Sequence, residues 1–219
     1  MVFHCLFEES GTFKNELRKM GFKAYDYDIS NRFKETDYIF DLFEEINLAY
    51  EEKSSIFDCI RKNDVVFAFF PCIRFSVNAQ LLFRCNTPQL NAWKLEDKLK
   101  YDLKLISELD TLYTLITKLV IIALHKGFKL IIENPYSQEH FLTKYWAVKP
   151  AIIDVDRRIL GDKMKKPTQY YFINCEPKNN DIQIESFTGE TVRENKVGTA
   201  YRSLIEKKYA EQFIKKYVI

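Results

Sequence analysis

An uninterrupted apolar run, which begins after Asp64 and ends at the Pro71-Cys72 step, constrains the fold of this chain most strongly. The run reads Val-Val-Phe-Ala-Phe-Phe over residues 65–70. A strand with one solvated face alternates apolar and polar residues, so an unbroken run predicts a central strand of a parallel α/β sheet, buried on both faces. Pro71 lacks an amide hydrogen and ends the strand, which places Cys72 at its carboxyl end. Because ligands bind at that edge of open α/β sheets, Cys72 is either a candidate nucleophile or simply a small buried residue.

The composition predicts one folded domain spanning residues 1–219. Nearly half of the residues are apolar, and 18 Phe and 13 Tyr are present, which is enough to form a core and is not typical of disorder. The net charge of +2 predicts no general attraction to nucleic acid, so any such contact needs a local basic patch. The five cysteines are scattered and contain no Cys-x-x-Cys pair, which argues against a disulfide framework and against a bound metal.

The same features predict where the protein resides. The first residues lack the basic region and apolar core of a signal peptide, and no apolar run reaches membrane-spanning length. We therefore expect a soluble, cytoplasmic protein with no membrane contact. An open sheet often leaves an exposed edge strand. The protein is therefore expected either to act alone or to cover that edge by forming a homo-oligomer or by binding a partner protein.

Strand and helix patterns alternate along the chain. Strands are expected over residues 3–7, 22–27, 64–70 and 128–132, with further extended pieces over 146–155, 169–174 and 182–187. Helices are expected within 37–50 and over 13–20, 56–60 and 99–123, and a last helix is expected from a capping box of Ser203 and Glu206. Segment 73–95 has few periodic signals and is expected to form a lid or loop insertion over the strand ends. The alternation predicts an α/β, Rossmann-like fold with a mostly parallel central sheet flanked by helices.

Polar groups follow three of the predicted strands. Glu133-Asn134-Pro135 comes directly after strand 128–132, just as Pro71-Cys72 follows the central strand. If the two strands are neighbours, a nucleophile and a carboxylic acid meet at one edge of the sheet, although chance can also produce this pattern. Asp26 and Asp28 close the second strand, where an acid commonly accepts hydrogen bonds from ribose hydroxyls. Asp28 is the favoured candidate, and a solvated loop acid is the alternative.

A basic segment lies further along the chain. Residues 157–166 contain five cationic side chains and form the best candidate for a phosphate contact. Three aspartates lie in or next to the segment, so a solvated loop is an equally good interpretation.

In their order and spacing, these motifs resemble those of the cytosine-C5 DNA methyltransferases, and the resemblance covers roughly residues 3–175. Residues 6–13, Leu-Phe-Glu-Glu-Ser-Gly-Thr-Phe, are similar to the family's Phe-x-Gly-x-Gly turn, which wraps S-adenosylmethionine. The resemblance implies a Rossmann-like methyltransferase fold with that cofactor. It implies cofactor contacts at Phe7, Gly11 and Thr12, with Asp28 on the ribose and Asp41 on the adenine amine.

The catalytic motifs of the family also have counterparts. Pro71-Cys72 resembles its Pro-Cys motif, Glu133-Asn134-Pro135 resembles its Glu-Asn-Val or Glu-Asn-Pro motif, and Arg158 resembles the arginine that braces the active site. Gly161-Asp162 and Lys166-Pro167-Thr168 are similar to a stretch seen in phage-type members. The resemblance thus implies catalytic roles for Cys72, Glu133 and Arg158, and substrate contacts for Pro71, Asn134 and Lys166.

The implied reaction is methylation of cytosine in DNA or in a smaller pyrimidine substrate. Cytosine C5 is a poor nucleophile, so the Cys72 thiolate adds to C6 while Glu133 hydrogen-bonds to N3 and the exocyclic amine, and the activated C5 takes the methyl group. Arg158 would help by stabilising the thiolate. A base within duplex DNA has to be flipped out of the stack to be reached.

The chain also departs from the family pattern. Glu9 stands where the cofactor turn has a glycine, and its bulk and charge are expected to crowd or repel the carboxylate of the cofactor. Ile73 replaces the glutamine that usually follows Pro-Cys, and no segment is long enough for a target-recognition domain. The alternative is therefore a catalytically inactive relative that binds a nucleotide or a protein partner.

Overall fold

The central strand β4 (Val65–Phe69) lies in the middle of a seven-stranded sheet in the computed structural model, which describes residues 1–83, 85, 87–192 and 204–219. The strand order is β3-β2-β1-β4-β5-β7-β6. The other strands are β1 (Val2–Leu6), β2 (Lys23–Asp28), β3 (Tyr38–Ile39), β5 (Lys129–Pro135), β6 (Ile152–Asp154) and β7 (Thr168–Ile173). All pairings within β3-β2-β1-β4-β5 are parallel, and β7 runs antiparallel to both of its neighbours.

This topology confirms the predicted α/β fold with a mostly parallel sheet. The first five strands follow the order of a Rossmann sheet, with which the fold is compatible. In such sheets the chain first builds outward from β1 in one direction and then crosses to β4 and builds in the other. The crevice at the carboxyl ends of β1 and β4 is therefore the switch point where ligands bind.

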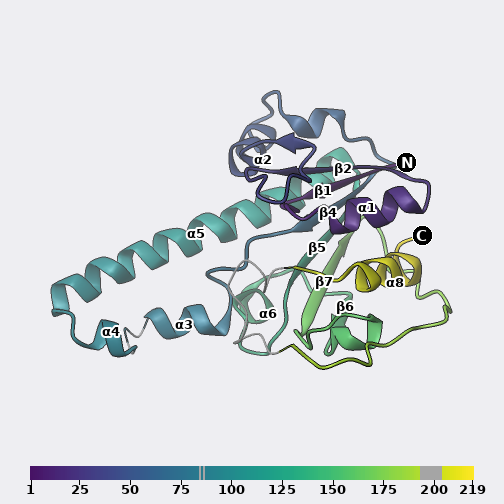
Figure 1. Cartoon of the computed structure of the whole chain (residues 1–219). Coiled ribbons are helices and arrows are strands. Elements are labelled where there is room, and N and C mark those ends of the chain that lie inside the picture. Colours follow the sequence, from purple (N-terminus) through teal and green to yellow (C-terminus); the bar gives the residue numbers. More distant parts are fainter. Residues whose placement is uncertain (84, 86, 193–203) are drawn as a thin grey trace.

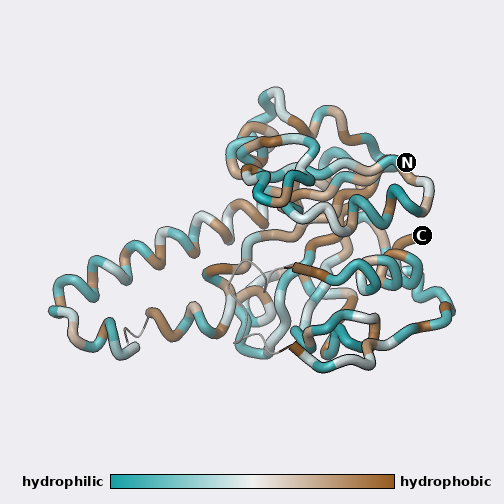
Figure 2. The backbone as a smooth tube through the Cα atoms, viewed as in Figure 1, coloured by the Kyte–Doolittle hydropathy of each residue, from teal (hydrophilic) through white to brown (hydrophobic). Residues whose placement is uncertain are grey.

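Helices cover both faces of the sheet (Figure 1). One face carries α2 (Leu42–Tyr50), η1 (Ile56–Cys59), α5 (Leu95–Lys126) and α6 (Phe141–Tyr145). The other face carries α1 (Thr12–Lys19) and α8 (Lys207–Tyr217), which lie side by side, with η2 (Arg157–Leu160) against α8. Side chains from the two faces of the same strands fill two separate cores: Val66 and Ala68 enter the first, and Val65 and Phe67 the second. Figure 2 shows the apolar strands enclosed between these layers. The unbroken run of β4 thus reflects burial on both sides.

A helical arm projects from this body (Figure 1). The N-terminal half of α5 extends away from the sheet, and α3 (Val77–Phe83) and α4 (Pro88–Asn91) run back along it. Arg74 pairs with Glu108 near the body, and Trp93 packs edge-on against Tyr101 with ring centroids 5.6 Å apart near the tip. The segment 73–95, expected as a loop or lid over the strand ends, is therefore largely helical and forms most of one side of a helical hairpin, while its first part, up to Leu82, lines the cavity at the strand ends. The apolar periodicity that predicts a helix over 99–123 covers only part of α5, which runs from Leu95 to Lys126.

Three other expectations need correction or fall outside the description. No strand forms over 182–187, because the Gln212 side chain on α8 accepts from the Glu185 amide and donates to the Glu185 carbonyl, at 2.6 and 2.9 Å, in place of a strand ladder. Within 146–155 only β6 pairs with the sheet. Ser203 lies outside the described residues, and α8 begins at Lys207 with Glu206 at its N-cap position. Among the described residues, no helix combines the length and the apolar character needed to cross a membrane.

Gly161 and Gly21 allow the packing between η2 and α8 to be tested. Both have a positive φ, +88° and +87°, but a Cβ at Gly161 would lie 2.7 Å from Lys208 Cγ, whereas one at Gly21 would meet no atom within 4 Å. We predict that Gly21→Ala lowers the free energy of unfolding by about 1 kcal/mol, through backbone strain alone. Gly161→Ala should cost about 1–3 kcal/mol more, because the Lys208 side chain on α8 must move away from the added methyl group. Urea denaturation measures both, and equal losses would contradict the described contact.

Candidate functional site

One large cavity opens at the switch point of the sheet. It has a volume of about 860 Å³ and is lined by residues that follow the carboxyl ends of β1, β2, β4 and β5. These residues include Phe7, Glu8, Glu9, Asp28, Pro71, Cys72, Glu133, Ser137, His140 and Lys166. The cavity has two parts: a β1–β2 side, which Glu8, Glu9 and Asp28 line, and a β4–β5 side, which contains Cys72 and Glu133. Six of these ten residues are site residues that the sequence analysis predicts. A seventh, Glu9, is the acid that is expected to interfere with cofactor binding.

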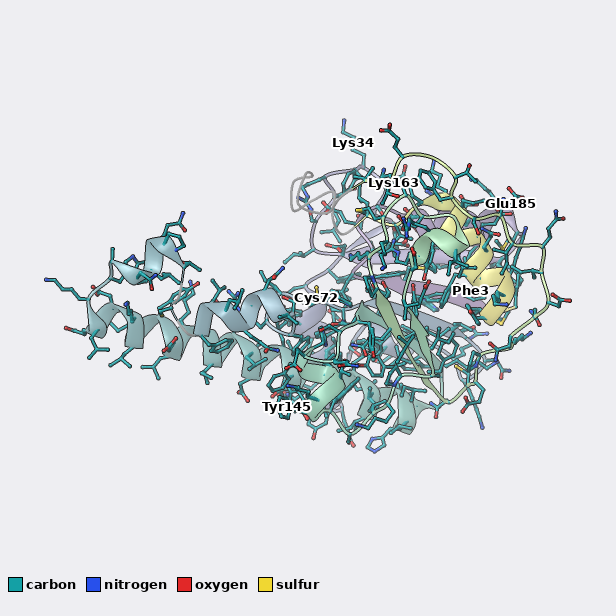
Figure 3. All side chains as sticks on the ribbon, turned by 90° about the horizontal axis from the view of Figure 1, so that it is seen from below. Phe3, Lys34, Cys72, Tyr145, Lys163 and Glu185 are labelled. Atoms are coloured by element: carbon teal, nitrogen blue, oxygen red, sulfur yellow. The ribbon has the colours of Figure 1, made fainter. Side chains whose placement is uncertain are left out.

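Cys72 and Glu133 line the same cavity, as their positions after two strands predict. In the parallel pairing of β4 with β5, Phe69 lies opposite Glu133, so the turn that carries Cys72 begins beside the Glu133 side chain. The Cys72 carbonyl accepts hydrogen bonds from the amides of Phe75 and Ser76, at 3.0 and 3.3 Å, which fixes the turn after Pro71. Figure 3 shows Cys72 where the arm joins the body. The sulfur and the carboxyl group therefore converge although they lie far apart in sequence.

The environment of Cys72 favours the neutral thiol. Burial raises the pKa of Cys72, the negative charge of Glu133 raises it further, and the positive charge of Lys166 opposes both. Oε1 of Glu133 is buried and has no hydrogen-bond partner among the described residues. A buried acceptor without a partner is costly, so this oxygen is suited to a ligand that brings a hydrogen-bond donor.

Asn134 has a structural position behind the cavity. Its side chain is fully buried and does not line the cavity, and Nδ2 donates to the Phe70 carbonyl at 3.0 Å. This bond ties the end of β5 to the residue before Pro71. The predicted substrate contact of Asn134 is thus replaced by a bond that holds the two catalytic candidates in register, whereas Pro71 and Lys166 do line the cavity.

His140 and Ser137 belong to the cavity wall but carry no motif in the sequence. Gln169 Nε2 approaches His140 Nδ1 at 3.3 Å, and Thr143 Oγ1 donates to Gln169 Oε1 at 3.1 Å, which fixes the amide orientation. Burial lowers the pKa of His140 to about 4, so the ring is neutral at neutral pH, accepts at Nδ1 and carries its proton on Nε2. Nε2 of His140 and Oγ of Ser137 are buried without a partner among the described residues. Together with Glu133, they give this side of the cavity donors as well as an acceptor.

Of the two adjacent arginines, Arg157 and not Arg158 interacts electrostatically with Glu133, although Arg157 does not line the cavity either. Arg158 pairs with Asp156 and donates to Thr191, and it does not line the cavity. Arg157 is fully buried, pairs with Asp162, and lies with its guanidinium carbon 4.8 Å from the Tyr209 ring centroid. Burial opposes the charge of Arg157, but Asp162 and, more weakly, Glu133 raise its pKa overall. Sequence alone does not distinguish two adjacent arginines. In the turn that begins at Asp156, the Arg157 side chain is buried, whereas the Arg158 side chain is partly exposed.

On the β1–β2 side, Phe7 and Asp28 lie as predicted. Phe7 has a φ of 60°, an uncommon backbone conformation for a bulky residue. Its ring centroid lies 5.2 Å from that of Phe70, and both residues line the cavity. Asp28 accepts from the Ser30 amide at 2.9 Å, and burial raises the pKa of Asp28. Asp41 lies elsewhere: its carboxylate accepts from the amides of Phe43 and Glu44 and caps α2.

Gly11 and Thr12 do not line the cavity. Gly11 occupies the N-cap of α1 with a φ of 62°, and a Cβ there would lie 3.1 Å from Glu35 Cβ, so the position favours glycine for a local structural reason. Thr12 Oγ1 lies 3.0 Å from Ser10 Oγ.

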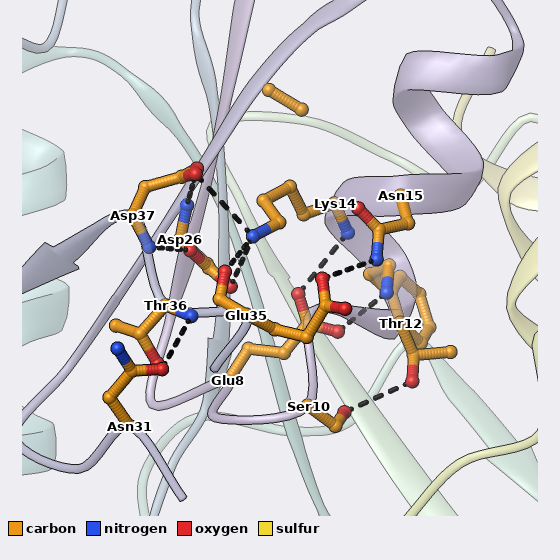
Figure 4. A network of polar contacts seen from close by, with 12 residues as sticks. Glu8, Ser10, Thr12, Lys14, Asn15, Asp26, Asn31, Glu35, Thr36 and Asp37 are labelled. Carbon is orange, nitrogen blue, oxygen red and sulfur yellow. Dashed lines mark hydrogen bonds and ion pairs between the residues drawn. The ribbon is translucent and has the colours of Figure 1, made fainter. Parts of the chain in front are cut away.

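Glu8 occupies the start of α1, a feature that the sequence did not predict. Its two carboxylate oxygens accept from the amides of Phe13 at 2.5 Å and Lys14 at 3.2 Å (Figure 4). The first amides of a helix are a ready anion site, and here the chain itself supplies the anion. Burial raises the pKa of Glu8 to about 7, against the effect of these two hydrogen bonds, and nearby Asp26 raises it further. Lys14 is directed to the other side, with Nζ 3.0 Å from Asp26 Oδ2.

Glu9 does not extend freely into the cavity. Its carboxylate accepts from Ser30 Oγ at 2.5 Å and from Arg32 Nε at 2.7 Å, and it forms an ion pair with Arg32. These bonds from Arg32 hold the pKa of Glu9 at about 2, well below its usual range. The charge expected to repel a cofactor is thus largely compensated, and the side chain ties the β1–α1 loop to the segment after β2.

No protein-family model and no curated protein sequence matches this chain.

The two acidic residues of the β1–α1 loop should respond differently to pH. The folded pKa of Glu8, about 7, exceeds the ordinary 4.5, so its stabilising contribution is full below pH 4.5 and is lost as pH rises to about 7. We predict that the wild type loses roughly 1–3 kcal/mol relative to Glu8→Gln between pH 5 and pH 7.5. In the control Glu9→Gln, the difference from wild type should stay constant, because Glu9 is ionised throughout this range. Denaturation at both pH values measures this, and parallel curves for Glu8→Gln would refute the buried, protonatable state.

Proposed function

We propose that this protein transfers a methyl group from S-adenosylmethionine to C5 of cytosine, in a nucleic acid or in a smaller pyrimidine substrate. The observation that supports this most is the shared cavity of Cys72 and Glu133, reached from two neighbouring strands and held in register by Asn134. A thiol beside a carboxyl group with an unused buried oxygen suits a heterocycle that is attacked at carbon and gripped at its nitrogen edge.

In the proposed reaction, each group on the β4–β5 side has a task. Cys72 sulfur forms a bond to C6 of the pyrimidine, which moves electron density to C5. Glu133 takes the proton of the Cys72 thiol, donates it to N3 from one oxygen and accepts from the exocyclic amine with the other. The Nε2–H of His140 and the hydroxyl of Ser137 are available to the remaining oxygens of the nucleotide. After C5 has taken the methyl group, a water molecule accepts the C5 proton, the electron pair of the C5–H bond forms the C5=C6 double bond, and the Cys72 sulfur leaves C6 as a thiolate. Because burial raises the pKa of Cys72, the thiol must lose its proton as the substrate binds, with Lys166 as the nearby cation.

The β1–β2 side suits most of the proposed cofactor. Asp28 is placed to accept from ribose hydroxyls, Phe7 offers an aromatic surface to the adenine, and Glu8 gives the wall a carboxylate that suits a cationic group. S-adenosylmethionine supplies an electrophilic methyl group when bound. Its own carboxylate cannot use the first amides of α1, since Glu8 already accepts from them. We therefore expect binding that is weaker than an open helix terminus would give.

A binding module without catalysis is the second candidate. The observation that favours it is the filled start of α1 together with the Glu9–Arg32 ion pair, which closes the loop against the segment after β2. In that case the cavity takes a nucleoside or nucleotide, and Cys72 is a half-buried thiol without a reaction. Ligand binding without methyl transfer distinguishes this candidate from the first.

The catalytic pair is tested by methyl transfer. We predict that Cys72→Ser lowers the transfer of radiolabelled methyl groups to cytosine by roughly a thousandfold or more, and Glu133→Gln by about 10²–10³-fold. The control is Cys59→Ser, which changes an exposed thiol on η1 and should leave transfer unchanged. Single-stranded DNA, duplex DNA and free nucleotide are assayed in parallel. Transfer that survives Cys72→Ser would remove this residue from the mechanism.

Cofactor binding is tested separately by thermal shift. S-adenosylmethionine should raise the melting temperature of the wild type, because a ligand that binds only the folded state stabilises it. We predict that Asp28→Asn reduces this shift, whereas Asp41→Asn, which changes an acid outside the cavity, does not. If the wild type shows no shift at millimolar cofactor but binds nucleosides, the second candidate is correct.

A further inference from the structure

The arm carries an apolar stripe that nothing in the described part of the chain covers. Leu95, Leu99, Leu103 and Ile106 lie on one side of α5 and are 71, 54, 72 and 54 % exposed. Spacings of four, four and three residues keep them on one face of the helix. A solvated helix face normally carries polar residues at these positions, so a continuous aliphatic stripe indicates an interaction surface.

The stripe is separate from the face of α5 that already packs within the arm. Leu105 is fully buried and Leu112 is nearly so, and Cys85 of the returning segment is also buried, with Sγ 4.0 Å from the Lys98 carbonyl. On a helix with about 100° per residue, this packed side lies more than a quarter turn away from the stripe. Figures 1 and 3 show from two directions that the arm extends away from the sheet. Within the residues that the structure describes, the stripe is therefore available to another molecule.

We propose that the stripe binds the same stripe of a second copy of this chain, with the two α5 helices antiparallel. The four side chains are arranged almost symmetrically about residue 101. A two-fold axis through that point brings Leu95 of one copy opposite Ile106 of the other, and Leu99 opposite Leu103, so all four pair with apolar partners. Such a self-complementary surface forms a closed dimer and not a filament.

The charges beside the stripe favour the antiparallel direction. Lys98 and Asp102 lie on one flank, between the stripe and the packed side, where Lys98 Nζ donates to the Asn91 carbonyl at 3.2 Å and Asp102 Oδ1 accepts from Cys85 Sγ at 3.8 Å. An antiparallel copy brings Lys98 opposite Asp102 of the other chain, twice per dimer, because the same flank of both helices then lies on one side of the interface. In a parallel copy this flank faces the opposite flank of the other helix, so the two charges do not meet. Asp110, one turn after Ile106, then falls near the start of the other copy's α5, where helix amides and Lys94 favour an anion. The arm as a whole mixes both signs, which disfavours a polyanionic partner.

Sedimentation velocity tests the proposal on the full chain, over roughly 1–100 µM, a range that brackets micromolar affinity. The wild type should sediment with twice the mass of one chain. Leu99→Asp and Leu103→Asp should raise the dissociation constant roughly tenfold or more, because an unpaired charge is then buried in the interface. Leu124→Asp is the matched control: Leu124 is 55 % exposed on the same helix but lies beyond the stripe, so the variant should dimerise like the wild type. All these positions are exposed, and circular dichroism verifies that the variants fold.

Charge reversal tests the direction of pairing. Lys98→Asp and Asp102→Lys should each weaken the dimer, and the double variant Lys98→Asp with Asp102→Lys should restore it, because opposite charges again face each other. A monomeric wild type, or a dimer that Leu99→Asp leaves intact, would overturn the proposal. A double variant as weak as the single variants would overturn the antiparallel arrangement. None of these readouts depends on methyl transfer.

Discussion

The parallel pairing of β4 with β5 is the constraint on which the site depends. Both strands are buried on two faces, and their register places Phe69 opposite Glu133. Pro71 ends pairing on one strand, and the Asn134 side chain bonds back to Phe70 from the other. Two polar groups that follow apolar runs are thereby held at one cavity. A shift of one residue would turn Glu133 to the opposite face of the sheet, so the hydrophobic pattern of the strands also fixes the chemistry.

The β1–α1 loop shows how a chain can modify a common ligand site from within. Glu8 supplies its own carboxylate to the amides of α1, and Glu9 is compensated by Arg32 and Ser30. Glu9 occupies a position where many nucleotide-binding turns have glycine, yet the cavity beside the two acids stays open because each carboxylate is bound by the protein. The consequence is a wall that favours neutral or cationic groups over anionic ones.

Sequence reasoning predicted the parts of this protein that follow from local pattern. The strand ends, and hence Cys72, Glu133 and Asp28, follow from apolar runs broken by Pro or by acids. The parts that depend on contacts between distant residues could not be predicted: Glu8 on α1, Asn134 on Phe70, and Arg157 buried against Asp162 and Tyr209. Segment 73–95 lacks a clear helical period because, among its described residues, only Phe75, Ala79, Cys85 and Leu90 are buried, so its structure depends on α5. The polar bonds of Gln212 that replace a strand at 182–187 likewise have no local signal.

The central claim is that Cys72 sulfur bonds to a pyrimidine while Glu133 holds the ring, and intact-protein mass spectrometry tests it most directly. A 5-fluorocytosine oligonucleotide is the suitable probe, because fluorine cannot leave as a cation and the step that expels the sulfur is blocked. With S-adenosylmethionine present, we expect an added mass equal to the oligonucleotide plus one methyl group, mapped by peptide analysis to Cys72. No adduct, or an adduct that persists in Cys72→Ser, would contradict the account.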